Sequence, residues 1–162
     1  MSTAIIDTFR QFFQQRMTST QPNHFNALGI QFVSIDKDRA VLDLPYGEHL
    51  LACPDPEWLA GGPITGLLDT CCAIAAASTM DQLTFCPTLD LRVDHLGIAM
   101  PGLTLHAEAE VYRKSRSVIF VRGFVYQDDR SRPVATGLAN FTPVDQITSD
   151  PARNAAKTAV EG

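Results

Sequence analysis

The sequence lacks several features that would place it in a well-marked class. In its 162 residues no apolar run approaches the roughly 20 residues that a membrane-spanning helix needs. Its 13 basic residues are outnumbered by 18 acidic ones, whereas nucleic-acid-binding proteins usually carry a basic face. The N-terminal segment also lacks the long apolar core of a secretory signal. We therefore expect a cytoplasmic protein that binds neither nucleic acid nor a membrane.

Cysteine is scarce, and its spacing is unlike that of a metal site. None of the four cysteines forms a CxxC pair, and no histidine cluster accompanies them, so we expect no metal and no cofactor. Cys71 and Cys72 are adjacent in an apolar stretch. This placement indicates small core residues in a reducing compartment rather than a catalytic thiol.

The composition that is present is that of a globular protein, with 45% hydrophobic and 19% charged residues. Apolar residues recur at helical spacing over residues 3–17, which predicts an amphipathic helix. Two short β-type runs, 28–36 and 39–46, are joined by a polar turn and predict a hairpin. Residues 48–61 contain two prolines and are expected to form a loop.

A long apolar helix and four strands complete the pattern. The segment GGPITGLLDTCCAIAAAS begins with a proline near the first helical position and is rich in helix-favouring alanine. A helix this apolar cannot lie on a surface. We therefore predict an α+β fold, in which a six-stranded antiparallel sheet wraps around this central helix and an extra helix precedes it. The four runs that supply the later strands are 87–97, 103–112, 117–127 and 133–144.

The predicted organisation has three parts. Residues 1–26 form an N-terminal helix and linker, residues 27–144 form the main domain, and residues 145–162 form a flexible C-terminal tail. The tail is polar and rich in alanine, a composition typical of mobile chain ends.

One carboxylate, Asp69, lies near the middle of the apolar helix. Counting along the helix places Gly62, Thr65, Gly66 and Ala73 on or near the same face, and all four are small. An unpaired buried carboxylate costs several kcal/mol. Two interpretations stay open: a structural aspartate bonded to a neighbouring loop or subunit, or a general base in a cleft lined by small residues.

Four motifs in this order resemble the hotdog-fold acyl-CoA thioesterases, most closely the phenylacetate-pathway type. They are a Gly pair with an acid eight residues after its first member, and then PTLDLRVDHLGIAMPG, LTLHAEAEVYRKSRS and VATGLANFTP. The resemblance covers residues 27–144. It implies a hotdog fold, an acyl-CoA substrate and a homodimer that assembles to a tetramer, with active sites at the interface between two subunits.

The resemblance also implies roles for individual residues. Asp69 would be the general base or nucleophile of thioester hydrolysis, and Thr88 would support it. The backbone N–H of Gly61, with Gly62 beside it, would polarise the thioester carbonyl. Elementary physics agrees, because free N–H groups and the helix dipole stabilise negative charge at a helix N-terminus.

Coenzyme A carries phosphates, and cations are needed to hold them. Arg113, Lys114 and Arg116 cluster at a predicted turn, and guanidinium groups are well suited to phosphate. The alternative is that these are ordinary solvated turn charges.

The sequence departs from the family pattern at two positions. Ala60 stands where many relatives have His, and Pro54 where many have Asn or Gln; losing one oxyanion donor costs about 10²–10³ in rate. His49 is the basic side chain of this loop that could replace them. Three functions stay open. Hydrolysis is favoured because Asp69 is retained, non-catalytic binding of acyl-CoA or a lipid-like ligand is second, and hydration or dehydration is third because no His closely precedes Gly61.

Overall fold

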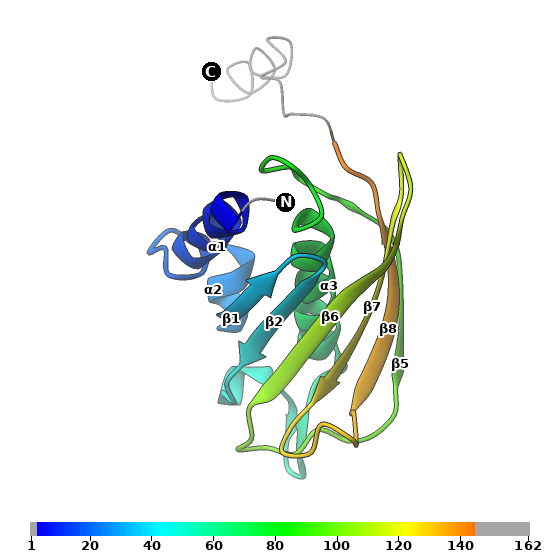
Figure 1. Ribbon diagram of the computed structural model, residues 1–162. Helices are drawn as coiled ribbons and strands as arrows, with labels where there is room; N and C mark the ends of the chain where they lie inside the picture. Colours follow the sequence, from blue (N-terminus) through cyan, green and yellow to red (C-terminus); the bar gives the residue numbers. More distant parts are fainter. Residues whose placement is uncertain (1–2, 145–162) are drawn as a thin grey trace, which may run out of the picture.

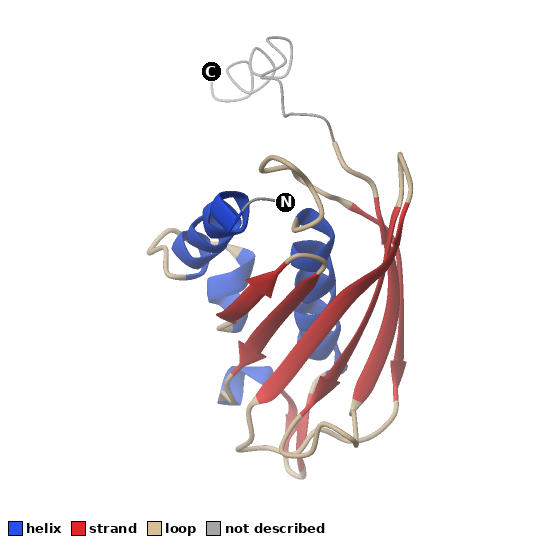
Figure 2. Cartoon of the chain, viewed as in Figure 1, coloured by secondary structure: helices blue, strands red, loops and turns tan. Residues whose placement is uncertain are grey.

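The computed structural model describes residues 3–144, with side chains from Ile6 onward, and it shows a six-stranded antiparallel sheet curved around one long helix (Figures 1 and 2). The strand order is β1-β2-β6-β7-β8-β5, so the predicted fold class is confirmed. The predicted tail, 145–162, lies outside the described residues.

The helices are α1 (Thr3–Met17), α2 (His24–Leu28), the short 3-10 helix η1 (Glu48–Leu50) and α3 (Gly61–Ala77). The strands are β1 (Gln31–Asp36), β2 (Arg39–Leu44), β3 (Leu51–Pro54), β4 (Glu57–Leu59), β5 (Thr88–His95), β6 (Leu105–Lys114), β7 (Ile119–Tyr126) and β8 (Ala135–Phe141).

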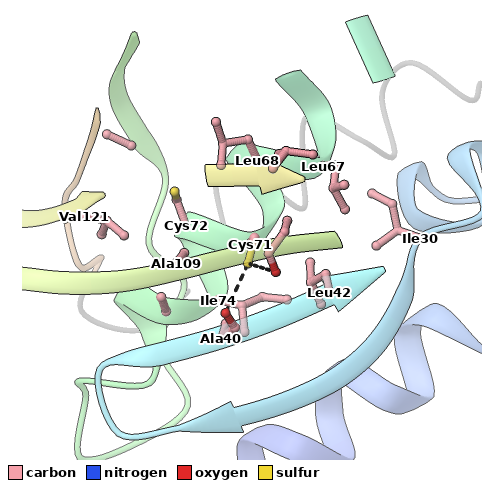
Figure 3. Close-up of a cluster of buried hydrophobic side chains, with 14 of the residues drawn as sticks. Ile30, Ala40, Leu42, Leu67, Leu68, Cys71, Cys72, Ile74, Ala109 and Val121 are labelled. Atoms are coloured by element: carbon pink, nitrogen blue, oxygen red, sulfur yellow. Dashed lines mark hydrogen bonds between the residues drawn. The ribbon is translucent and has the colours of Figure 1, made fainter. Parts of the chain in front are cut away.

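The central helix α3 forms the core together with the inner face of the sheet. Leu67, Leu68, Cys71 and Ile74 point from the helix toward the strands and are at most 1% exposed (Figure 3). In β7, in β8 and in β6 as far as Ala109, every second residue faces this helix and is buried, while its neighbours in the strand are more exposed. Burying a Leu or Ile side chain stabilises a fold by roughly 1.5–3 kcal/mol, so this contact holds the domain together.

Two glycines on neighbouring strands give α3 its close approach to the sheet. Gly123 of β7 and Gly137 of β8 are paired directly across the ladder. A Cβ at Gly137 would lie 2.6 Å from Leu68 Cδ2, and one at Gly123 would lie 2.9 Å from Leu68 Cδ1. The pair of glycines therefore forms a shallow dimple in the sheet, and Leu68 fills it.

Replacing Gly137 by alanine should destabilise the protein by about 1–3 kcal/mol, because the new methyl group overlaps Leu68 and forces this buried side chain, α3 or β8 to shift. The measurement is the free energy of unfolding in urea. Gly97→Ala is the matched control, since no atom lies within 4 Å of a Cβ at that position. Equal stability of the two variants would contradict the tight packing of Leu68 against these glycines.

The predicted core cysteines are buried as expected. Cys71 is 0% exposed, and its thiol donates to the carbonyl oxygens of Ala40 and Ala107, at 3.4 and 3.5 Å (Figure 3). Burial raises the pKa of Cys71 well above its usual value and also raises that of Cys72. Both thiols therefore stay protonated, which argues against a nucleophilic role.

The prediction of a simple loop before the central helix was wrong. Residues 51–59 form the hairpin β3–β4, which pairs Leu51 with Leu59. The two prolines do not break it, because Pro54 ends β3 and Pro56 lies in the turn. The N–H of Ala60 then donates to the carbonyl of Leu50 at 2.9 Å, so the hairpin and η1 hold the entry to α3.

The short helix α2 was not predicted either. Asn23 caps it by accepting a bond from the Asn26 N–H, and Gly29 ends it with a left-handed backbone, φ 83°. Five residues are too few to show helical periodicity, so only these caps mark α2 in the sequence. The proposed boundary after residue 26 falls inside α2, and the division into three parts stays a prediction.

Candidate active site

Asp69 follows Leu68 on α3 and faces the edge strand β5. It is half-buried, and the Oγ1 hydroxyl of Thr88, at the start of β5, donates to its Oδ1 at 2.9 Å. Within residues 3–144, no other hydrogen bond to this carboxylate is present. The structure thus brings together two of the residues singled out in the sequence, and it leaves one carboxylate oxygen available to a ligand.

The N-terminus of α3 offers free backbone donors. Ala60 is the N-cap and has no side chain that could bond to the helix, and Pro63 has no N–H. Gly61 and Gly62 are exposed, and their N–H groups precede the first intrahelical bonds. A developing oxyanion placed here would meet unpaired N–H groups and the positive end of the helix dipole.

One chain does not bring Gly61 and Asp69 to the same point. Eight residues of α-helix separate them, a rise of about 12 Å. A carbonyl group that accepts a hydrogen bond of about 3 Å from Gly61 therefore lies too far from Asp69 of the same chain for attack on its carbon.

A residue that the sequence pattern did not mark lies beside Gly61. The ring of His95, the last residue of β5, lies 3.3 Å (Cε1) and 3.4 Å (Nε2) from where a Cβ of Gly61 would be. Thr88 and His95 are thus the two ends of one strand, the first at Asp69 and the second at the helix N-terminus. The sequence shows only that His95 ends a strand. Its contact with Gly61 becomes apparent only when that strand is packed against α3.

The predicted phosphate-binding residues lie at the other end of the helix. Arg113, Lys114 and Arg116 are exposed at the turn between β6 and β7. The Nζ of Lys114 donates to the carbonyl of Thr79, just beyond the C-terminus of α3, at 2.8 Å. This bond fixes the basic turn at the C-terminal end of α3, beyond Asp69 along the helix and away from Gly61.

Strand β5 forms one edge of the sheet and pairs on one side with β8. At the opposite edge α1 packs on β1 and buries Phe9 completely, whereas in the described part of the chain no segment covers the free side of β5. Apolar side chains are exposed at both ends of this strand, an arrangement typical of a surface that binds another chain. The exposed residues are Phe85, Leu89, Leu96, Ile98 and Met100.

A groove of about 700 Å³ lies on the sheet face that points away from α3, and Asp69, Gly61 and Thr88 do not line it. Five of its charged side chains are paired with each other: Glu110 with Arg39 and Arg122, and Glu108 with Arg130. The hydrogen bonds from Arg130 lower the pKa of the Glu108 carboxyl. These residues satisfy one another, so the groove is not the candidate site.

The described residues contain neither a metal-ligand cluster nor a helix that could span a membrane. No three His, Cys, Asp or Glu side chains between residues 3 and 144 converge on one point. Over the same range no helix combines the length and apolarity that a bilayer crossing needs.

Comparison with known proteins identifies the family. The sequence profile of the thioesterase superfamily matches residues 59–134. A solved structure from Pseudomonas aeruginosa is 34% identical, with a TM-score of 0.73 over 86% of this chain and 99% of that one. The chain belongs to the thioesterase superfamily. The predicted resemblance and the hotdog fold are thereby confirmed.

Two more distant structures share the fold of this thioesterase-superfamily chain. The PaaI protein from the phenylacetic acid degradation operon of Escherichia coli is 20% identical, with a TM-score of 0.70 over 84% of this chain and 94% of that one. A Streptococcus mutans protein bound to acetyl CoA is 18% identical, with a TM-score of 0.66 over 79% of this chain and 96% of that one. No protein with a curated description matches the chain significantly.

The bond between Thr88 and Asp69 can be tested by removing the hydroxyl without changing the shape of the side chain. If this bond orients Asp69 for catalysis, Thr88→Val should lower kcat for acyl-CoA hydrolysis roughly tenfold, equivalent to about 1.4 kcal/mol. Thr88→Ser keeps the donor and should stay near the wild-type rate. A Val variant as active as the Ser variant would contradict this role of the bond.

Proposed function

We propose that this member of the thioesterase superfamily hydrolyses an acyl-CoA thioester to a free acid and CoA. The observation that carries the proposal is the half-buried Asp69, held by Thr88 on the otherwise apolar helix α3. A carboxylate kept at a small-residue face, with one oxygen unpaired in the described structure, is placed as a general base needs to be.

The proposed reaction uses water and one carboxylate. Asp69 takes a proton from water as the water oxygen attacks the thioester carbonyl carbon. The negative charge that forms on the carbonyl oxygen is stabilised by the N–H of Gly61, with Gly62 beside it. Cleavage of the C–S bond then releases the acid, and the CoA thiolate takes the proton from Asp69. Asp69 could instead attack the carbon directly, giving an anhydride that water hydrolyses.

The proposed site needs two copies of the chain, because the 12 Å rise from Gly61 to Asp69 (about eight helical residues) is too long for one carbonyl group. Antiparallel pairing of two β5 strands near their middle would satisfy both free edges and bury the apolar residues at the strand ends. Thr88 of one copy would then lie close to His95 of the other. This brings Asp69 of the first copy to Gly61 of the second, twice per homodimer.

The remaining parts of the proposal concern the ligand and the assembly. Arg113, Lys114 and Arg116 are proposed to hold CoA phosphates, since the turn that carries them is exposed and is fixed beside the C-terminal end of α3, beyond Asp69. A pairing of two dimers into a tetramer and a cytoplasmic location stay predictions from the sequence.

A specific observation favours a second candidate, a protein that binds acyl-CoA or a lipid-like ligand without hydrolysing it. The N-cap of α3 is Ala60, which has no polar side chain to add to the backbone donors. If those donors are too few, the same surfaces would bind the thioester and leave it intact.

Replacing Asp69 by asparagine separates these functions. Asn still accepts a hydrogen bond from Thr88 but cannot take a proton, so we expect kcat to fall by about 10² or more. The measurement is thiol release from phenylacetyl, benzoyl, butyryl, hexanoyl and lauroyl CoA. Asp81→Asn, at the next acid along the chain and exposed, is the matched control. A wild-type protein that hydrolyses none of these, yet is thermally stabilised by one, would be the binding protein.

Mixing two inactive variants tests the shared site. Asp69→Asn and Gly61→Val should each be inactive, and their mixture should recover roughly a quarter of the wild-type rate, since half of randomly exchanged dimers are hybrid and each hybrid has one intact site. The mixture is unfolded and refolded together, and hybrid dimers are verified by native mass spectrometry, which resolves them because glycine and valine differ in mass. No recovery from verified hybrid dimers would place Asp69 and Gly61 in one chain's site.

A further inference from the structure

The inference concerns His95 and rests on the proposed function. An oxyanion is best stabilised by more than one donor, and loss of a single donor costs about 10²–10³ in rate. At the N-terminus of α3 the cap Ala60 contributes no side chain and Pro63 contributes no N–H. The backbone of Gly61 and Gly62 therefore supplies few donors, and a side chain from another element could supply a further one.

His95 is placed to supply this further donor. Its ring contacts the space beside the Gly61 α-carbon, with Nε2 3.4 Å and Cε1 3.3 Å from the position of a Cβ. A side chain at Gly61 would compete with the ring, so the glycine and the histidine share this corner of the site. His95 is exposed and makes no hydrogen bond to any of the residues 3–144, so its ring N–H is free for a ligand.

The other histidines are placed differently. His49 was the predicted replacement for the missing polar side chains. Its Nε2 lies 3.3 Å from the carbonyl oxygen of Leu28, so the ring is already hydrogen-bonded within the fold. His106 bonds through Nδ1 to Asp43 at 2.7 Å, and Asp43 lies on β2. His24 packs beside Gly66, more than a turn along the helix from its N-terminus.

We propose that His95 is a catalytic residue whose Nε2–H donates a hydrogen bond to the thioester carbonyl oxygen, together with the N–H of Gly61 from the same chain. The neutral imidazole carries one N–H, which is sufficient for this role. Because His95 ends β5, pairing of two β5 strands sets this donor pair opposite the Asp69 and Thr88 of the other copy. Strand β5 thus carries His95, which polarises the carbonyl, at one end and Thr88, which binds the general base, at the other.

Two variants of His95 distinguish this role from a structural one. His95→Ala should lower kcat by about 10² with little change in KM, since the bond strengthens as charge develops on the oxygen. His95→Gln keeps an N–H donor and should recover part of the loss. His106→Gln is the control and should leave the rate unchanged. An Ala variant within about twofold of wild-type kcat would overturn the proposal.

A second measurement does not depend on turnover. Phenylacetyl and hexanoyl dethia-CoA, in which CH₂ replaces the thioester sulfur, are labelled with ¹³C at the carbonyl and bound to wild-type and His95→Ala protein. In the infrared difference spectrum the carbonyl stretch of the bound ketone should lie lower in wild type than in the variant. Equal frequencies would overturn the role of His95, even in a protein without hydrolytic activity. Failure of both analogues to bind would overturn the proposed function and the role of His95 together.

Discussion

The packing of α3 into the concave sheet is the contact on which the other features depend. Leu68 enters the dimple formed by Gly123 and Gly137, and this fit fixes how far the helix is rotated about its axis. The next residue, Asp69, thereby points about 100° around the helix axis from Leu68, on the side of the edge strand β5. A helix rotated by one residue would bury the carboxylate in the core. Two glycines that lie on the sheet, away from the candidate site, therefore determine where the acid points.

Strand β5 connects the two halves of the candidate site. Its first residue bonds to Asp69, and its last residue lies at the N-terminus of α3. The helix and the strand are held at two points, and the free edge of the strand lies between them. In the proposed function, the surface that would complete the sheet and the surface that would perform the chemistry are the same, which would explain why apolar residues surround the polar groups.

The sequence predicted those parts of the fold whose evidence is local. The apolar helix, the alternation in β5, β6 and β8, and the unusual position of Asp69 can all be read from spacing. The hairpin β3–β4 was missed because proline suggests a break even where it lies in a turn, and α2 because five residues show no period. His95 could not be found in this way, since its contact with Gly61 joins residues 34 positions apart and depends on the length of β5.

The eight-residue separation of Gly61 and Asp69 has a kinetic consequence. Each chain can complete its own core, since α3 and the six strands belong to one copy. In the proposed arrangement a complete site exists only where two copies meet, so specific activity would fall on dilution while the fold persists. The rate of thioester cleavage would then be second order in protein at low concentration, and the level of expression would itself switch the activity on.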